Sequence, residues 1–163
     1  MASGKTTIGK LISESLSIPF FDLDFLIEQK LQLNIHEIFE KKGELFFRKH
    51  ERETIETFLN STDNYVLALG GGTPCYFDNF LLYKKEDINS FYLKASVGTL
   101  LNRLETQKSA RPIIANCSNE ALKEFVAKHL FERNHFYNQV QTVIAIDDKN
   151  ETEIVLEILS KLT

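Results

Sequence analysis

Apolar residues recur at helical spacing along the first part of the chain. Ile8, Leu11, Ile12 and Leu16 share one face of a helix that begins at Lys5, and Pro19 ends the pattern. The same pattern predicts further helices over residues 44–59, 97–104, 120–137 and 151–162, and an Asn34-x-x-Glu37 capping box predicts a short helix that Gly43 ends.

Short apolar runs between these helices predict buried strands. The runs cover residues 20–24, 65–69, 90–93 and 142–146. Because strands alternate with helices throughout, the pattern favours an α/β fold with a parallel sheet covered on both faces. Residues 106–119 have no regular periodicity and contain Arg111-Pro112, so we expect a long loop there.

Composition narrows the class of protein. The 163 residues suit one domain, and 43% hydrophobic with 26% charged residues is typical of a soluble globular chain. A net charge of −4 argues against a broad nucleic-acid surface, although a local cationic cleft remains compatible with it. No apolar run approaches the length of a membrane span, and the first residues do not show a charged segment followed by an apolar run and a small-residue cleavage site. We therefore expect a cytoplasmic monomer whose partners are small molecules, not nucleic acid or membrane.

Gly4-Lys5-Thr6 is the second half of the phosphate-binding pattern G-x-x-x-x-G-K-[ST]. In such a loop, backbone N–H groups bind phosphate oxygens, the lysine reaches the β- and γ-phosphates, and the hydroxyl binds Mg²⁺. The first glycine of the pattern would precede Met1. The tripeptide alone is equally compatible with an ordinary helix start.

Asp22 and Asp24 are predicted to lie at the tip of the strand over residues 20–24. Two carboxylates one residue apart on a strand point to the same face, where they could share a cation and a substrate hydroxyl. An acidic turn after a strand is the simpler interpretation.

Arg48 and Glu51 are neighbours on one helical face, so Glu51 could orient a guanidinium that binds a carboxylate. A solvated charge pair has the same spacing. Gly70-Gly71-Gly72 directly follows a predicted strand, which favours a ligand that approaches the main chain over a flexible linker. Arg111 in the loop and Arg133 near the end of a helix are compatible with a lid and an anion site, or with ordinary surface arginines.

These segments, in this order, resemble the shikimate kinase family of the P-loop kinase fold. The matching stretches are G-K-T-T-I-G-K from Gly4, F-D-L-D-x-x-I-E from Phe21, G-E-x-x-F-R-x-x-E from Gly43, L-G-G-G from Leu69, R-P-I-I from Arg111 and R-x-x-x-Y from Arg133. The resemblance covers almost the whole chain. It implies ATP-dependent phosphorylation of the 3-hydroxyl of shikimate, a step toward chorismate and the aromatic amino acids.

The resemblance also implies roles for individual residues. Shikimate would be held by Asp24, Arg48, Gly71 and Arg133, with the arginines on its carboxylate and Asp24 on its ring hydroxyls. ATP would be bound by Ser3, Gly4, Lys5, Thr6, Thr7, Arg103 and Arg111. Mg²⁺ would be held by Thr6 and, through water, Asp22. The catalytic residues would be Lys5, Asp24 and the lid residue Arg111, in a single domain with shikimate-binding helices over about 24–60 and a lid over about 106–119.

The family fold is a three-layer sandwich, like the nucleoside-monophosphate kinases, with a parallel sheet of order 2-3-1-4-5. This chain lacks the first, central strand, so we expect the natural chain to start upstream of Met1. Two rival functions remain: another small-molecule P-loop kinase of the gluconate-kinase type, and a non-catalytic homologue that binds shikimate but, with part of the loop missing, not ATP.

Overall fold

The computed structural model describes residues 2–61, 63–105 and 118–162, and these form two compact units. One unit is Lys5–Asn79; the other comprises Met1–Gly4 and Phe80–Thr163. The described helices include none that is both long and apolar enough to cross a membrane.

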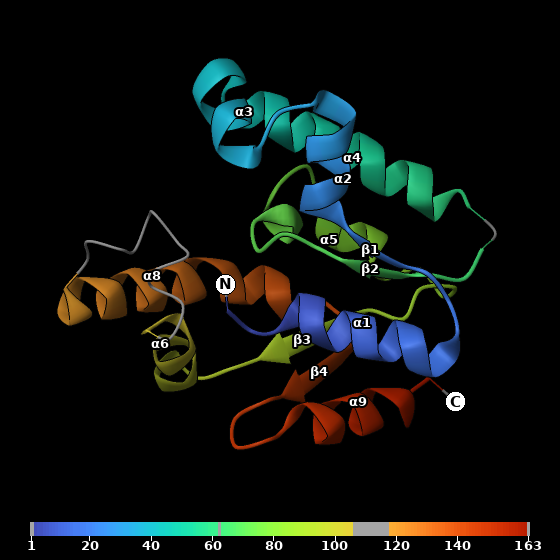
Figure 1. Ribbon diagram of the computed structural model, residues 1–163, viewed down its shortest axis with the longest axis vertical. Helices are drawn as coiled ribbons and strands as arrows, with labels where there is room; N and C mark the ends of the chain where they lie inside the picture. The colour runs from blue at the N-terminus through green and yellow to red at the C-terminus, as the bar shows by residue number, and fades with distance from the viewer. Residues whose placement is uncertain (1, 62, 106–117, 163) are drawn as a thin grey trace. The chain divides into compact units, whose positions relative to one another are not determined.

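The Lys5–Asn79 unit contains a short parallel strand pair and the helices around it (Figure 1). Strands β1 and β2 pair in the register Phe20↔Val66, Phe21↔Leu67 and Asp22↔Ala68. Helix α1 contacts both strands, and α4 packs against α2 and α3. The elements are α1 (Lys5–Leu16), β1 (Phe20–Asp22), α2 (Leu23–Leu31), α3 (Ile35–Lys42), α4 (Glu44–Leu59), β2 (Val66–Ala68) and the 3-10 turn η1 (Thr73–Cys75).

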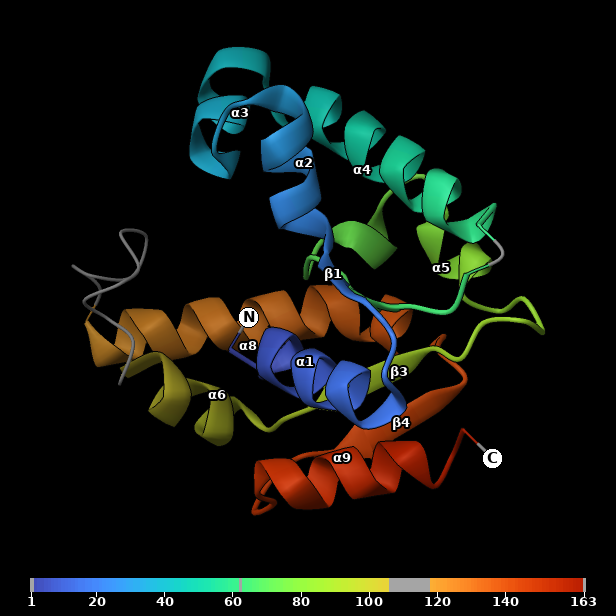
Figure 2. The same cartoon turned by 45° about the vertical axis from the view of Figure 1, so that its right-hand side comes forward.

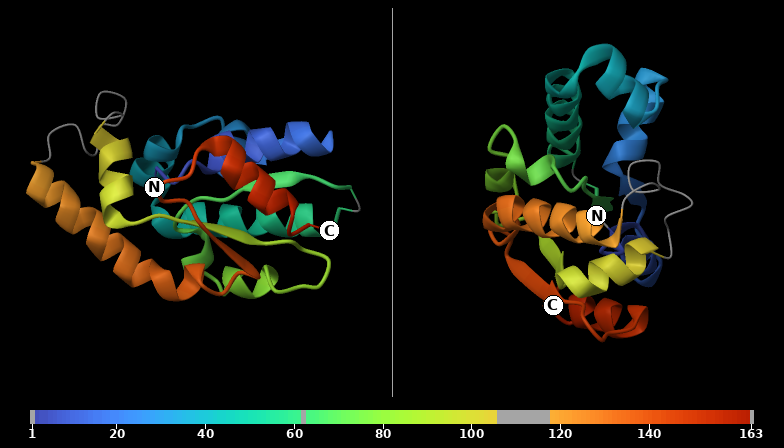
Figure 3. Two further views of the ribbon diagram at one scale, coloured as in Figure 1. Left: turned by 90° about the horizontal axis from the view of Figure 1, so that it is seen from below. Right: turned by 90° about the vertical axis from the view of Figure 1, so that its left-hand side faces the viewer.

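The second unit also contains a parallel strand pair, β3 with β4, in a register that runs from Phe91↔Thr142 to Lys94↔Ala145. Helix α9 lies along β4 (Figure 2), and α6 packs beside α8 (Figure 3). Its elements are β3 (Phe91–Lys94), α6 (Val97–Glu105), α8 (Asn119–Tyr137), β4 (Thr142–Ala145) and α9 (Glu151–Leu159); α5 (Asn79–Leu82) begins where the first unit ends.

Each unit has its own apolar core. In Lys5–Asn79, the fully buried side chains Leu23, Ile27, Ile38 and Ile55 come from the three helices α2, α3 and α4. In the other unit, the fully buried side chains come from β4, α6, α8 and α9 and from the position after β4: Leu104, Leu122, Ile144, Ile146, Ile154 and Ile158. Apolar burial of this kind is what holds an amphipathic helix against its neighbours.

Most predicted elements are confirmed within one to three residues. The capping box at the start of α3 is present: the Asn34 side chain accepts from the Glu37 amide and Glu37 accepts from the Asn34 amide. Gly43 ends α3 with φ of 84°, a backbone conformation that residues with a side chain rarely adopt. The strand pairs β1–β2 and β3–β4 are both parallel, as the sequence predicts. The missing-strand hypothesis stays a prediction.

The strand predicted over residues 20–24 is wrong at its end. It stops at Asp22, which is also the N-cap of α2: its side chain accepts a hydrogen bond from the Asp24 amide at 3.2 Å. Asp24 therefore lies in the first turn of a helix, not on a strand beside Asp22. Asp caps helices well because its oxygens accept the unpaired amides of the first turn.

Candidate functional site

Arg48 and Glu51 form a buried ion pair on α4. Arg48 Nη1 donates to Glu51 Oε2 at 2.9 Å, and the Glu51 side chain is fully buried. Burying a carboxylate costs several kcal/mol unless charge and hydrogen bonds compensate it. Burial works against the charge of Arg48, but the bonds to Glu51 and Glu44 outweigh it and raise its pKa. The simpler interpretation, a solvated surface pair, is therefore wrong.

The second oxygen of Glu51 also has a partner. The Thr73 hydroxyl, on η1, donates to Glu51 Oε1, and Asn79 Nδ2 donates to the Thr73 carbonyl at 2.9 Å. Asn79 Oδ1 in turn accepts from Arg52 Nη1 at 3.1 Å. This chain of bonds ties α4 to the segment after β2 and leaves Glu51 little freedom to move.

Glu44 and Tyr76 occupy another edge of the same guanidinium. Glu44 Oε1 accepts from Arg48 Nε at 3.3 Å, from Arg48 Nη2 at 3.2 Å and from the Tyr76 hydroxyl at 2.7 Å. The Tyr76 ring centroid lies 4.2 Å from Arg48 Cζ, within cation–π range. We call Asp24, Glu44, Arg48, Glu51, Thr73 and Tyr76 the Arg48 cluster.

Two glycines of the Gly70–Gly72 run are required by this cluster. A Cβ on Gly72 would lie 2.5 Å from Arg48 Nη2, and one on Gly70 would lie 3.0 Å from Asp24 Oδ1 and 3.2 Å from Glu51 Oε1. Neither glycine has a positive φ, so the reason is close approach and not backbone freedom. The glycines let a main-chain segment pass directly against the charged side chains.

The pKa of Asp24 lies well above the ordinary value for an aspartate. Its pKa is raised from 3.8 to about 6, first by burial and then by the negative charges of Asp22 and Glu51, with Lys5 and Arg48 acting in the opposite direction. A carboxylate whose pKa is raised toward neutral pH is a stronger base, and so a better proton acceptor, than an ordinary carboxylate. Perturbed acids of this kind cluster at functional sites.

The phosphate-loop residues lie at the N-terminus of α1. Lys5, Thr6 and Thr7 form its first turn, where unpaired amides and the helix dipole favour an anion, and Gly4 before them has φ of 86°. The Thr6 hydroxyl donates to Asp22 Oδ2 at 3.0 Å. The two predicted Mg²⁺ residues are thus in contact, and their oxygens are the hard donors that Mg²⁺ prefers. Among the described residues, no three His, Cys, Asp or Glu side chains form a metal-binding group.

Most of the remaining predicted residues lie outside the Lys5–Asn79 unit. Arg103 on α6 donates through Nη1 to the Ser3 carbonyl at 3.2 Å, so two of the predicted ATP residues meet. Arg133 lies on α8. Arg111 and almost all of the predicted lid fall outside the described residues. Gly71 lies between the two closely packed glycines.

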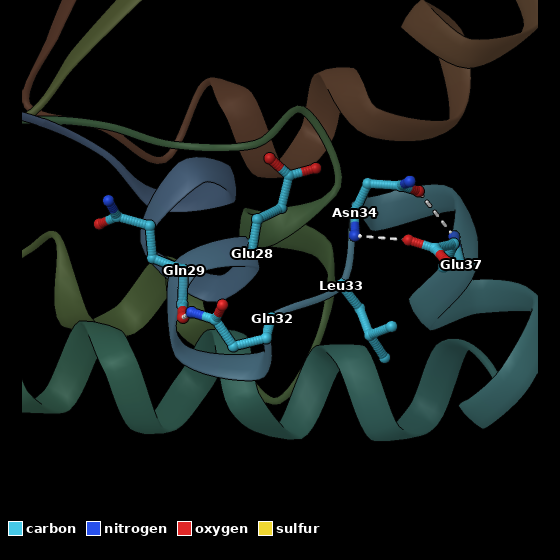
Figure 4. A pocket seen from close by; sticks show the side chains of 6 residues that line it. All are labelled: Glu28, Gln29, Gln32, Leu33, Asn34 and Glu37. Atoms are coloured by element: carbon cyan, nitrogen blue, oxygen red, sulfur yellow. Dashed lines mark hydrogen bonds between the residues drawn. The ribbon is translucent and has the colours of Figure 1, made fainter.

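A hollow of about 320 Å³ lies between α2 and α3, apart from the Arg48 cluster (Figure 4). Glu28, Glu37 and Asn34 are among the residues that line it. Its carboxylates already accept backbone amides: Glu28 from Ile35 at 2.8 Å and Glu37 from Asn34 at 3.1 Å. The hollow is therefore explained by helix capping.

Sequence reasoning missed three members of the cluster. Glu44 is four residues before Arg48 on the same helix, so its spacing was a usable signal. Thr73 and Tyr76 reach α4 from positions 22 and 32 residues away from their partners, and no local pattern indicates such contacts.

The whole chain matches a family model. Residues 1–163 match the model described as shikimate kinase. A shikimate kinase of Flavobacterium psychrophilum is 52% identical, over 97% of this chain and 92% of that protein. One of Flavobacterium johnsoniae is 50% identical, over 99% of this chain and 94% of that protein.

Solved structures agree with the sequence comparison. The crystal structure of a shikimate kinase from Bacteroides thetaiotaomicron has a TM-score of 0.91 at 31% identity, covering 99% of this chain and 93% of that one. A shikimate kinase from Acinetobacter baumannii in complex with shikimate has a TM-score of 0.85 at 28% identity, covering 99% and 88%. The similarity includes a protein seen with its substrate bound.

Proposed function

The chain belongs to the shikimate kinase family, and on that premise we propose that it transfers the γ-phosphate of ATP to the 3-hydroxyl of shikimate. The products are shikimate 3-phosphate and ADP, in the pathway to chorismate and the aromatic amino acids. The observation that carries the proposal for this chain is the Arg48 cluster. A guanidinium fixed by a buried carboxylate beside a poised aspartate suits a substrate that has both a carboxylate and hydroxyl groups.

Arg48 binds the shikimate carboxylate in this proposal. Glu51 orients the guanidinium through a 2.9 Å hydrogen bond, and Gly72 leaves room for it because a Cβ at that position would clash with Arg48 Nη2. A planar, preorganised fork recognises a carboxylate more selectively than a flexible ammonium does. Gly71 and, from α8, Arg133 complete the proposed shikimate residues.

Asp24 receives the proton in the transfer step. The 3-hydroxyl oxygen forms a bond to the γ-phosphorus as the bond from that phosphorus to the β,γ-bridging oxygen breaks, and the hydroxyl proton passes to the Asp24 carboxylate. With a pKa of about 6, Asp24 is ionised at neutral pH and still basic enough to align the hydroxyl. Phosphoryl transfer depends mostly on such positioning and on charge neutralisation.

The nucleotide is bound at the start of α1. Lys5 supplies positive charge to the β- and γ-phosphates, and the amides of the first turn of α1 bind phosphate oxygens. Ser3, Gly4, Thr7 and Arg103 complete the proposed ATP residues, with Arg111 as the cation of the lid. Thr6 and Asp22 would hold Mg²⁺, which supplies charge neutralisation on the phosphates when bound. Their 3.0 Å contact supports this assignment.

Arg48→Lys tests the proposal while keeping a cation beside Glu51. We expect the KM for shikimate to rise about 10- to 100-fold because a charge-assisted, two-pronged bond is lost, with little change in the KM for ATP. A coupled assay of ADP release measures both. Lys49→Ala is the matched control, since it removes an exposed cation from the next position of α4.

Three outcomes would contradict the proposal. An unchanged shikimate KM in Arg48→Lys would remove Arg48 from the site. Turnover of a sugar acid but not of shikimate would favour a gluconate-kinase-like enzyme. Shikimate binding without ADP release would favour the non-catalytic homologue.

A further inference from the structure

One oxygen of Glu44 collects three hydrogen bonds. Oε1 accepts from Arg48 Nε and Nη2 at 3.3 and 3.2 Å and from the Tyr76 hydroxyl at 2.7 Å. An acceptor shared by Nε and Nη2 of an arginine occupies one of the edges through which guanidinium groups bind carboxylates. A carboxylate of the chain itself therefore sits where a ligand carboxylate would bind.

Glu44 and Glu51 contact the same arginine in different environments. Glu51 is fully buried and also accepts from Thr73, so it stays in place. The Glu44 side chain is 49% exposed and is the first residue of α4. Arg48 itself is buried, so only the Glu44 end of this pair is open to water, which can solvate the Glu44 carboxylate once it separates. Glu44 can therefore exchange its bonds to Arg48 for bonds to water, whereas Glu51 cannot.

Tyr76 holds this arrangement together. Its ring covers the guanidinium at 4.2 Å, and its hydroxyl donates to the same Glu44 oxygen that Arg48 binds. The hydrogen bond to Glu44 is the leading cause of the raised pKa of Tyr76, so the hydroxyl remains a donor at neutral pH. Tyr76 thus stabilises the position of Glu44 through its hydroxyl and does not displace Glu44 from the guanidinium of Arg48.

We propose that Glu44 is a placeholder carboxylate, held on Arg48 by Tyr76 and displaced when the carboxylate of shikimate binds. The inference rests on the proposed function, which makes Arg48 the carboxylate-binding residue. Shikimate must then exchange one carboxylate for another, so its affinity is lower than Arg48 alone would give. Small carboxylates that lack hydroxyl contacts elsewhere in the site displace Glu44 poorly, which makes the exchange a filter for the correct substrate.

Two structural roles for Glu44 give different expectations. An acid in the first turn of α4 stabilises the helix through its dipole, and this role alone leaves shikimate affinity unchanged when the charge is removed. A role in orienting Arg48 within the complex makes affinity fall. The placeholder role makes affinity rise, and it makes affinity rise as well when the hydrogen bond from Tyr76 that holds Glu44 is removed, which simple charge repulsion by Glu44 does not.

Glu44→Gln separates these cases because glutamine keeps the shape and removes the charge. We expect the Kd for shikimate, measured by calorimetry, to fall about three- to tenfold, since a neutral acceptor holds Arg48 about half as strongly. The Kd for ADP with Mg²⁺ stays the same. Glu53→Gln is the matched control: it lies on the same helix, is 44% exposed and pairs with Lys30 at 3.8 Å, and should leave shikimate affinity unchanged.

Tyr76→Phe provides a second, independent readout. It keeps the ring on Arg48 and removes only the hydroxyl that holds Glu44, so shikimate should again bind more tightly, by a smaller factor. In the Glu44→Gln background the same change should have no further effect, because the charge it acts on is gone. Equal effects of Tyr76→Phe in both backgrounds would overturn the inference.

The outcomes also distinguish this inference from the proposed function. Unchanged or weaker shikimate binding in Glu44→Gln, with a wild-type chain that binds shikimate, overturns the placeholder role alone. A wild-type chain that does not bind shikimate overturns both.

Discussion

At the scale of single residues, the ionised Asp24 carboxylate lowers the stability of the folded chain at neutral pH. Its pKa is raised to about 6 by burial and by the charges of Asp22 and Glu51, more than Lys5 and Arg48 lower it. The folded chain therefore binds a proton more readily at this position than the unfolded chain does. Stability from this group is fully present below pH 3.8 and is lost as pH rises through about 6.

Asp24→Asn removes this cost. At pH 7.5 we expect its free energy of unfolding to exceed that of the wild type by on the order of 2 kcal/mol, because the pKa difference is about two units. The gain should disappear as pH falls toward about 4. Urea unfolding at several pH values measures it, and an equal difference at pH 4 and pH 7.5 would contradict the assignment. Turnover in the same variant should fall about 100-fold or more.

At the scale of elements, apolar periodicity predicted those helices that have a proline, a glycine or a capping residue near their ends. Helix α1 ends at Leu16, shortly before Pro19, while Asn34 caps the start of α3 and Gly43 lies between α3 and α4. The effect of such residues on the backbone is local. Helix α2 was missed because it follows β1 without a turn, so Leu23 continues the apolar run Phe20-Phe21 and a strand and a helix look alike there. Asp22 marks the boundary only through its capping bond to Asp24.

The packing of α1 on β1 gives a prediction at this scale. Replacing a helical glycine by alanine usually stabilises a protein by up to about 1 kcal/mol. A Cβ on Gly9, however, would lie 2.6 Å from ring carbon Cε2 of Phe20, so we expect Gly9→Ala to destabilise the chain by about 1–3 kcal/mol. Thermal unfolding measures the change.

Two further variants test the cause. Gly98→Ala on α6 is the control, since the atom nearest to its Cβ is 3.8 Å away, and it should be neutral or stabilising. Phe20→Leu should reduce the cost of Gly9→Ala. A purely additive double variant would mean that the Phe20 ring is not the cause.

At the scale of the whole molecule, the order of motifs predicted more than any single motif. Gly-Lys-Thr, Asp-x-Asp and Phe-Arg-x-x-Glu each had an ordinary interpretation, but together they indicated the family that the comparisons show. The contacts of Thr73 and Tyr76 with α4 could not be predicted in this way, because they depend on how the chain returns after β2. The order of motifs therefore indicates the family, whereas the contacts around Arg48 depend on the folded structure.

Ligand-linked stability tests the two proposed binding regions separately. A ligand at 100 times its Kd stabilises the folded chain by about 2.7 kcal/mol, which corresponds to a rise in Tm of about 5–10 °C for a chain of this size. We expect shikimate and ADP with Mg²⁺ each to raise the Tm of the wild type.

At the same ligand concentrations, Arg48→Lys should lose most of the Tm shift caused by shikimate and keep the shift caused by ADP, because it acts on the carboxylate contact. Lys5→Met should lose the ADP shift and keep the shikimate shift, because it acts on the phosphates. Loss of both shifts in either variant would mean that the two regions do not bind their ligands independently.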